Sequence, residues 1–553
     1  VRPQFPRFRG KASQSPAERN LARRLKVRFK RGTLKAAMAA YARHPRVEHV
    51  EPIGIHTVSV VPNDSYYRNP PPASEHWDYW DAYGIDAESA WDIETGSDQV
   101  VVAILDTGVR YFHQDLGGVW PDWQPWGPDD PQAHGNIWIN PFEIPANGID
   151  DDGNGYIDDT LGWDFVDSDD VPEPCVDVDC TTPDNDPDDG NGHGTHVAGT
   201  VAAMTNNGTL VSGVAGGWSD GTVYGHGNGV KILPLRIGYS AGIRGKGFVR
   251  MDWAAEAMDY VAAQVQRGVN ITAINCSWGS SDTGGLSAAV DNLLANDVVV
   301  VVAAGNDSSN IPEYLNSRDD CVDVAATNRD GEGALFSNYG KWVDVAAPGV
   351  DIVSTYRDRY ESDPNVQEIA VLSGTSMAAP HVAGIVALLE SYDSRLTGPQ
   401  KVQTILSNVI PYTDSLDLGS GIANARLALE ALAPVRDYAD AEIPVFGSVD
   451  GSCLKTFDSD NVYESLRENR PWGRLKKLGH YLEHKWTIHV TGGASVIFYV
   501  EAYQTTKNER DHFVFSYSTD DTSYTEMLTV TNTADDNTLD GYALPANTRG
   551  TVY

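Results

Sequence analysis

Long apolar runs alternate with stretches of helical spacing through the middle of the chain, from Trp91 to about Ala433. Runs such as Val100 to Leu105 do not alternate polar and apolar positions, so both faces of each predicted strand are expected to be buried. Strands of this kind separated by helices are typical of a parallel sheet covered on both sides. We therefore predict a doubly wound α/β fold, with reactive groups in loops beyond the carboxyl ends of the strands. The strand-like and helical runs are Val100 to Leu105, Val197 to Met204, Val230 to Leu235, Trp253 to Gln266, Ile271 to Cys276, Val298 to Ala304, Val322 to Ala326, Val343 to Ala346 and Val382 to Tyr392.

A shorter pattern precedes this region. It predicts a strand at Leu25 to Phe29, a helix from Thr33 to Arg43 and a second strand from Arg46 to Val50. This miniature α/β unit is too small to fold alone. The stretch from Val61 to Ala73 is rich in Pro, Asn and Tyr and is interpreted as a linker or docking arm.

The pattern changes again after Pro434, where short alternating segments are separated by Asp, Asn, Ser and Gly. This spacing predicts an antiparallel β-sandwich. The boundaries are therefore expected near residues 60 and 433, which gives regions 1–60, 61–433 and 434–553, and we expect the last to be incomplete because it stops within a strand-like stretch. The alternating segments are Lys485 to Val490, Ala494 to Val500, His512 to Tyr517 and Glu526 to Val530.

Charge and composition narrow the possible partners. The formal net charge of −36 argues against nucleic acid, because phosphate binding needs clustered Lys and Arg. The charge is uneven: residues 1–58 carry 14 Lys and Arg against 3 Asp and Glu, so a basic leader precedes an acidic body. The longest apolar run, Val298 to Ala304, is far shorter than a bilayer span, so no membrane crossing is predicted.

The five cysteines do not form a disulfide scaffold. Cys175 and Cys180 lie five residues apart in an Asp-rich loop, where we expect a small bridge. Cys276 falls in an apolar strand and is interpreted as a small buried residue, although a bonded role is the alternative. The pattern does not assign Cys321 or Cys453.

Three polar residues stand at positions suited to chemistry. Asp106 ends an apolar strand, His193 lies in a glycine-rich segment before a helix, and Ser376 precedes a helix that carries Pro380. We place Pro380 in the first turn, where a missing N–H costs nothing. Each residue alone has an ordinary interpretation: a turn Asp, a surface or core His, and a helix-capping Ser. A Ser at a helix N-terminus would also lie where backbone N–H groups favour negative charge.

Together the three segments resemble the signatures of the subtilase family of serine proteases: AILDTGV, HGTHVAGT and GTSMAAPHVAG occur in the order Asp, His, Ser. The resemblance covers roughly residues 61–433. It implies that Ser376 is the nucleophile, His193 the general base and acid, and Asp106 the group that orients the imidazole. The segment VVVVVAAGND resembles the family's oxyanion strand and assigns Asn306 as a side-chain donor to the tetrahedral intermediate.

The segment INCSWGS resembles the stretch that pairs with the substrate backbone as an added strand. The resemblance implies one wall of the pocket for the residue before the scissile bond at Ser277, Trp278 and Gly279, and the other wall at Ala304 and Gly305. Broad endopeptidase specificity follows. Carboxylates at Asp319 and Asp320 are an option for binding a basic side chain, but a solvated loop is the simpler interpretation of that segment.

The run DDDGNGYIDD starts like an EF-hand loop, with oxygen ligands at alternate positions and Gly155 for the turn. Leu161 occupies the position of the usual closing Glu, so Asp158 or Asp159 must close the site. Because so many carboxylates repel one another without a cation, we expect calcium here rather than a solvated acidic loop. The expected ligands are Asp150, Asp152, Asn154, Tyr156 and Asp159.

The resemblance implies a second calcium site and a processed leader. The second set of ligands is Asp64, Asp115, Asn207 and the carbonyls of Thr209 and Val211. The weaker candidate is the oxygen-rich loop from Asp184 to Asp189. Residues 1–60 resemble the family's propeptide, an intramolecular inhibitor that we expect to be excised between Ile55 and Val61. The chain is thus expected to be a secreted, extracellular protease that acts on proteins or peptides.

Competing functions predict other signatures. An α/β-hydrolase esterase would carry its nucleophile in GxSxG and follow the order Ser, Asp, His, whereas Ser376 lies in GTSMA and the order here is Asp, His, Ser. A zinc protease would carry HExxH, which the sequence lacks. A binding module derived from a protease would have lost one of the four catalytic candidates. All four are present, so an active enzyme is the favoured interpretation.

Overall fold

The structure is a computed structural model, and its chain divides into two compact units, Val1–Ala431 and Leu432–Tyr553. In the first unit, only the antiparallel pair of strands β1 (Arg2–Pro3) and β2 (Leu25–Lys26) is described before residue 61, and β2 falls within a predicted strand. The remainder of the predicted leader elements and Cys453 lie outside the described residues. The described residues are 2–3, 25–26, 61–68, 75–118, 127–129, 131, 134–168, 175–177, 180, 182–242, 245–358, 368–432, 439–450, 465–467, 482–490, 496–500, 502–504, 512–531, 533, 540–545 and 548–553.

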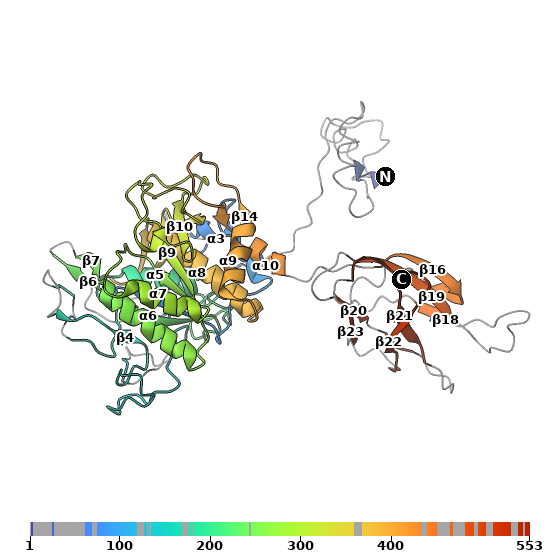
Figure 1. Ribbon diagram of the computed structural model, residues 1–553, viewed down its shortest axis with the longest axis horizontal. Helices are drawn as coiled ribbons and strands as arrows, with labels where there is room; N and C mark the ends of the chain where they lie inside the picture. Colours follow the sequence, from blue (N-terminus) through green and yellow to red (C-terminus); the bar gives the residue numbers. More distant parts are fainter. Residues whose placement is uncertain are drawn as a thin grey trace, which may run out of the picture. The chain divides into compact units, whose positions relative to one another are not determined.

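A nine-stranded sheet forms the centre of the first unit (Figure 1), in the order β14-β15-β11-β10-β9-β8-β3-β5-β4. Every neighbouring pair is parallel except β14 and β15. The predicted α/β class with a mostly parallel sheet is therefore confirmed. The strands are β3 (Val101–Asp106), β4 (Trp163–Asp164), β5 (Lys231–Arg236), β8 (Ile271–Cys276), β9 (Val299–Ala303), β10 (Val322–Thr327), β11 (Val345–Pro348), β14 (Val409–Ile410) and β15 (Ile422–Ala423).

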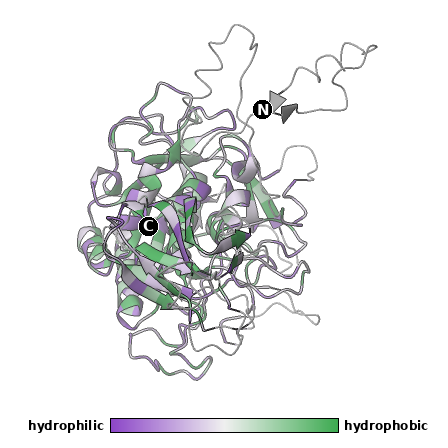
Figure 2. Ribbon diagram, turned by 90° about the vertical axis from the view of Figure 1, so that its right-hand side faces the viewer, coloured by the Kyte–Doolittle hydropathy of each residue, from purple (hydrophilic) through white to green (hydrophobic). Residues whose placement is uncertain are grey.

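Two helix pairs cover this sheet. Helix α5 (His193–Ala202) packs against α8 (Thr375–Tyr392), and α6 (Met251–Gln266) packs against α7 (Leu286–Ala295). Both α8 and α6 contact β3 and β8, so these central strands are buried between helices, as their unbroken apolar sequences require. The buried hydrophobic residues lie largely on these strands and helices, and green hydrophobic stretches are visible on strand and helix ribbons in Figure 2. Further helices are α3 (Trp77–Trp80), α4 (Ala87–Trp91), α9 (Gly398–Ser407) and α10 (Ala425–Leu432), with a 3-10 turn at Leu315–Ser317.

The strand order brings three chain segments to one edge. β8 lies between β3 and β9, and all three run parallel, so the residues after Asp106, Cys276 and Ala303 emerge side by side. Small antiparallel hairpins surround this edge. They are formed by β6 (Gly238–Ala241) with β7 (Lys246–Val249), and by β12 (Ile352–Tyr356) with β13 (Glu368–Leu372). Neither hairpin was predicted from the sequence.

The second unit contains small antiparallel sheets among its described residues. Four of its strands lie close to the alternating segments of the sequence, β19, β20, β21 and β22. The strands are β16 (Ala439–Phe446), β17 (Ser448–Asp450), β18 (Ser465–Arg467), β19 (Glu483–Val490), β20 (Val496–Val500), β21 (Val514–Tyr517), β22 (Thr525–Thr529), β23 (Asp540–Leu544) and β24 (Gly550–Val552).

Among the described residues, no helix combines the length and apolarity needed to cross a bilayer.

Candidate active site

Asp106 and His193 meet at the carboxyl edge of the sheet. Asp106 is the last residue of β3, and its buried carboxylate accepts hydrogen bonds from the Thr107 N–H and from His193 Nδ1, each at 2.8 Å. Because a carboxylate can only accept, Nδ1 carries a proton and the neutral imidazole presents Nε2 as its acceptor. The His193 side chain is 30% exposed, so the imidazole ring that carries Nε2 reaches the surface.

The environment of His193 favours its charged form. Burial alone would lower the pKa of the imidazole, but the charge of Asp106 and the hydrogen bond to it outweigh burial and raise this pKa above its ordinary value. The arrangement therefore stabilises the imidazolium that His193 becomes when it accepts a proton.

A residue that the sequence analysis did not single out holds these two segments together. Asp189 is completely buried, and its Oδ1 accepts from Thr107 Oγ1 at 2.9 Å and from the N–H groups of Asn191 and Gly192. Its Oδ2 accepts from the N–H and hydroxyl of Thr195, at 2.9 and 2.7 Å. Asp189 thus fixes the start of α5 beside the end of β3. Its only signal in the sequence was a place at the end of an oxygen-rich loop.

Ser376 is the second residue of α8, so its N–H is one of the first four of the helix, which have no intrahelical acceptor. Its hydroxyl donates to the carbonyl of Ser277 at 3.1 Å. The hydroxyl thus donates to the chain that follows β8, and it makes no hydrogen bond to His193 within the described residues. Such bonds are often unformed before substrate binds.

Pro380 is the sixth residue of α8, so its predicted place in the first turn is wrong. The missing N–H of Pro380 removes the usual donor to the carbonyl of Ser376 four residues earlier. That carbonyl accepts instead from Ser277 Oγ at 3.0 Å. The proline therefore permits a direct tie between the serine helix and the neighbouring strand end.

Asn306 follows β9 and is oriented by Thr375. Its Oδ1 accepts from the N–H of Thr375 at 2.9 Å and from its hydroxyl at 3.1 Å, while Thr375 Oγ1 accepts from the Gly305 N–H at 3.0 Å. These bonds identify which amide atom is oxygen. Within the described residues the Nδ2 group makes no hydrogen bond, so it remains available as a donor.

The five predicted pocket residues lie on adjoining strand ends. Ser277 to Gly279 follow β8, and Ala304 and Gly305 follow β9. Trp278 is half-buried, and its indole N–H donates to the carbonyl of Leu105 at 2.7 Å, so this side chain braces the end of β3. Gly305 has φ 99°, and a Cβ there would lie 2.4 Å from the Asn338 amide.

His196, the second histidine of the HGTH segment, lies away from this chemistry. It is completely buried, and its Nε2 lies 3.1 Å from the carbonyl of Ile352 and 3.2 Å from that of Ala370. Burial lowers its pKa to about 3. It ties α5 to the hairpin of β12 and β13.

The acidic loop is compact, and its side chains converge. Asp150 and Asp152 both accept from the Asn154 N–H, and Asn154 Nδ2 donates to Asp159 at 2.8 Å. The N–H of Tyr156 donates to Asn154 Oδ1. Burial raises the pKa of Asp159 to about 7, even though it accepts from the Tyr260 hydroxyl.

Glu143 was missed by the sequence analysis because it precedes the acidic run. Carboxylate oxygens of Glu143, Asp150 and Asp152 all lie within 4.8 Å of one another. Glu143 is 7% exposed, and its buried Oε2 has no hydrogen-bond partner in the described part of the chain. A buried carboxylate that keeps one unpartnered oxygen and lies beside two other carboxylates fits a hard cation such as calcium.

The second predicted ligand set also comes together. Asp64 accepts from the Asn207 N–H at 2.9 Å, and Asp115 accepts from Asn207 Nδ2 at 2.9 Å and from the Val211 N–H at 2.8 Å. The Thr209 N–H donates to Asn207 Oδ1. Burial raises the pKa of Asp64 to about 6 and that of Asp115 well above its usual range. Two buried carboxylates in one loop cluster fit a bound cation.

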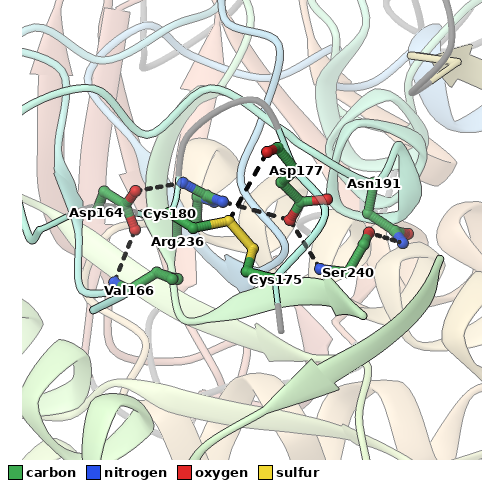
Figure 3. Close-up of a disulfide and its surroundings, with 8 residues drawn as sticks. All are labelled: Asp164, Val166, Cys175, Asp177, Cys180, Asn191, Arg236 and Ser240. Atoms are coloured by element: carbon green, nitrogen blue, oxygen red, sulfur yellow. Dashed lines mark hydrogen bonds and ion pairs between the residues drawn. A yellow bond between two sulfur atoms is a disulfide. The ribbon is translucent and has the colours of Figure 1, made fainter. Parts of the chain in front are cut away.

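The predicted bridge between Cys175 and Cys180 is present (Figure 3). Between them, Asp177 accepts from the Ser240 N–H at 2.7 Å and lies 3.4 Å from the buried Arg236. Ser240 Oγ in turn accepts from Asn191, two residues before His193. The bridged loop therefore supports the chain segment that carries the histidine. Cys276 and Cys321 are buried free thiols.

A parallel-sheet enzyme fold, with an Asp–His pair at the sheet edge and a serine at a neighbouring helix N-terminus, defines a serine hydrolase. The chain belongs to the Subtilase family, whose model matches residues 97–427, and is a serine endopeptidase. It is 33% identical over 374 residues to the "Thermophilic serine proteinase" of Bacillus sp. (strain AK1), covering 66% of this chain and 70% of that protein. It is 30% identical to the "Extracellular basic protease" of Dichelobacter nodosus, covering 74% and 62%. A solved protease structure from Pseudoalteromonas arctica PAMC 21717 matches with TM-score 0.50 and 29% identity, covering 67% of this chain and 99% of that one.

Proposed function

We propose that the protein is a secreted, calcium-dependent serine endopeptidase that acts through an acyl-enzyme on Ser376 and is made as a zymogen. The observation that carries the catalytic part is the 2.8 Å hydrogen bond from His193 to Asp106, which leaves the unprotonated Nε2 of the imidazole as an acceptor at the sheet edge. Hydrogen bonds between Ser376 and Ser277 hold the serine at the same edge. A base, its orienting carboxylate and a hydroxyl are the minimum set for acyl transfer.

The reaction proceeds in two proton-balanced halves. Ser376 Oγ attacks the scissile carbonyl while its proton moves to His193 Nε2, and Asp106 stabilises the resulting imidazolium. The tetrahedral oxyanion accepts hydrogen bonds from Asn306 Nδ2 and the Ser376 N–H. Collapse breaks the C–N bond, and His193 gives its proton to the departing amine. Water then attacks the ester by the same route in reverse, which frees the acid product and Ser376.

Asn306→Ala is expected to lower kcat by about 10²- to 10³-fold with little change in KM, the loss known for the same donor in a subtilisin. The donor acts on charge that exists only in the transition state, so substrate binding is spared. Steady-state kinetics on a chromogenic peptide measure both constants. Asn310→Ala, an exposed asparagine in the same loop, is the matched control. A rise in KM at unchanged kcat would assign Asn306 to substrate binding instead.

Substrate binding is proposed along the chain that follows β8. An extended peptide adds to the main chain of Ser277, Trp278 and Gly279, with Ala304 and Gly305 on the opposite side of its side-chain pocket. Backbone hydrogen bonds give affinity for any extended segment and leave preference to the pockets. Protein and peptide substrates are therefore proposed.

Calcium is proposed at both carboxylate clusters. In the first, Glu143 joins Asp150, Asp152, Asn154 and Asp159, with the carbonyl of Tyr156 as a further oxygen donor. In the second, Asp115 and Asn207 act with the carbonyls of Thr209 and Val211, and Asp64 joins from the segment that follows the leader. Bound calcium supplies the positive charge that buried carboxylates lack and so stabilises the folded state.

Removing calcium with EGTA is expected to lower the melting temperature, and the loss should be greater at pH 8 than at pH 5.5. Carboxylates must be ionised to bind calcium, and the pKa values of about 6 for Asp64 and about 7 for Asp159 place their ionisation between these two pH values. Without calcium, a raised carboxyl pKa contributes stability at low pH that is lost as pH rises through it. At 100 times the dissociation constant, calcium contributes about 2.7 kcal/mol per site. Differential scanning calorimetry with and without EGTA measures this, and Asp152→Asn isolates the first loop. No decrease in melting temperature on addition of EGTA, or an equal decrease at both pH values, would contradict the proposal.

The basic leader, residues 1–60, is proposed to be an inhibitory propeptide that docks on the acidic body and is removed by the enzyme itself between Ile55 and Val61. Opposite net charges favour that docking. Secretion is proposed because relatives include proteins named as extracellular proteases.

One experiment tests this function as a whole. The purified chain is incubated with casein, with and without calcium, while mass spectrometry follows the leader. Casein hydrolysis together with loss of about sixty N-terminal residues is expected. A folded, calcium-loaded chain that cleaves no protein and keeps its leader would overturn the proposal.

A further inference from the structure

A carboxylate lies directly against one wall of the proposed substrate pocket. Glu313 follows β9 in the chain, and its side chain accepts a hydrogen bond from the Ser280 N–H. A Cβ placed on Gly279 would lie 2.6 Å from Glu313 Oε2 and 3.0 Å from Oε1. Gly279 does not have positive φ. Its missing side chain therefore serves the close approach of this carboxylate rather than an unusual backbone conformation.

The segment that carries Glu313 is fixed at the same wall. The Leu315 N–H donates to Ser280 Oγ at 2.8 Å, and the Tyr314 N–H donates to the Ser280 carbonyl at 3.4 Å. Leu315 is completely buried, which anchors the segment in the core. Glu313 is thus held in place by its own chain as well as by its carboxylate.

The charge of Glu313 is not neutralised within the described residues. It forms no ion pair there, and its Oε1 accepts no hydrogen bond, although the side chain is half-buried. The neighbouring Arg318 is occupied by Asp291 at 2.6 Å and Asp320 at 2.8 Å. A partly desolvated carboxylate with an uncommitted oxygen beside the proposed substrate strand attracts a cationic group.

The acidic residues considered from the sequence do not have this placement. Asp319 and Asp320 are exposed, and Asp320 is paired with Arg318. Glu313 was not identified from the sequence because it lies in a loop without a recognisable motif, and only the tertiary contact with Gly279 identifies it.

We propose that Glu313 determines specificity by favouring Lys or Arg as the substrate residue that supplies the scissile carbonyl. This inference rests on the proposed function, in which the substrate strand lies along Ser277 to Gly279. Ser376 Oγ bonds to the Ser277 carbonyl, so the scissile bond lies at the start of this wall. The side chain of the substrate residue that precedes the scissile bond extends along the wall to Gly279. There the ammonium group of Lys or the guanidinium group of Arg reaches the Glu313 carboxylate.

The test uses four peptides that differ only at this residue, which is Lys, Arg, norleucine or Glu. The parent is expected to cleave the Lys and Arg peptides with the higher kcat/KM. Glu313→Gln keeps the shape and the acceptor for the Ser280 N–H but removes the charge. It should lower kcat/KM for Lys and Arg by about 10- to 100-fold, the range for losing a hydrogen bond to a charged group, and leave norleucine unchanged. Asp319→Asn is the matched control and should change nothing.

Glu313→Lys provides a second variant, which should turn the preference toward the Glu peptide. Its norleucine activity reports whether it has folded. If the parent cleaves Lys and norleucine equally and Glu313→Gln alters neither, the specificity inference is overturned while the proposed function stands. If no folded variant or parent cleaves any peptide, the proposed function itself fails. If Glu313→Gln lowers kcat/KM equally for the norleucine and Lys peptides, Glu313 has only a structural role, which also overturns the inference.

Discussion

Ser376→Ala is expected to lower kcat for protein and peptide hydrolysis by about 10⁶-fold, the loss known for removing this nucleophile in a subtilisin. The reason is that no acyl-enzyme can form without Oγ, while the oxyanion donors and the pocket remain. Substrate binding should therefore persist, with KM or inhibitor affinity close to that of the parent. A covalent fluorophosphonate probe should label the parent at Ser376 and leave the variant unlabelled.

The variant also loses the hydrogen bond from Ser376 Oγ to the Ser277 carbonyl, which joins two buried residues, so a moderate loss of stability is expected beside the loss of catalysis. Ser373→Ala is the matched control. Ser373 lies three residues before the nucleophile, and its exposed hydroxyl accepts a hydrogen bond from the Asp351 N–H. It should retain parental activity. Undiminished hydrolysis by Ser376→Ala would show that another residue is the nucleophile. If the expressed variant keeps its leader while the parent loses it, removal of the leader also depends on Ser376.

Asp106→Asn is expected to lower kcat/KM by about 10⁴-fold at neutral pH, the loss known for the equivalent change in a trypsin-like protease. An amide can donate to His193 Nδ1, which places the imidazole proton on Nε2 and removes the base from the reacting side. The effect should be visible as loss of catalysis with the fold intact, because Asn matches Asp in size.

The pH profile gives this prediction a second readout. In the parent, His193 must be neutral to act as base, and Asp106 raises its pKa, so kcat/KM falls as pH drops through that raised value. Without the Asp106 charge, burial dominates and the pKa of His193 falls. The acid limb of the residual activity should therefore move to lower pH. Asp98→Asn, an exposed carboxylate before β3, should leave rate and profile unchanged. An unshifted acid limb in Asp106→Asn would mean that another group controls it.

The central sheet was largely predictable because its signal is local. Strands buried on both faces need unbroken apolar runs, and β8 (Ile271–Cys276) matches its predicted range. The hairpins β6–β7 and β12–β13 were not predicted from the sequence. Short strands of mixed polarity, such as Lys246–Val249, owe their conformation to cross-strand partners. Pro380 shows the same limit: the sequence placed it in the first turn, whereas the helix begins five residues earlier.

The catalytic candidates Asp106, His193 and Ser376 could be predicted from the sequence alone, because they occur in motifs whose residue types and order resemble those of the family. Their surroundings could not be predicted, because they depend on tertiary contacts. Asp106 and His193 are 87 residues apart, and Ser277 and Ser376 are 99 apart, so their contacts exist only once the strands lie in one sheet.

The same holds for the residues that the sequence did not reveal, Asp189, Glu143 and Glu313. Each is a single carboxylate whose role depends on a partner brought close by folding: backbone N–H groups, two further carboxylates, and a glycine without a side chain. An isolated acidic residue is most often only solvated, and nothing in its local sequence distinguishes it. Its role depends on how deeply it is buried and on its distance from partner groups, and both are set by the packing of the folded chain.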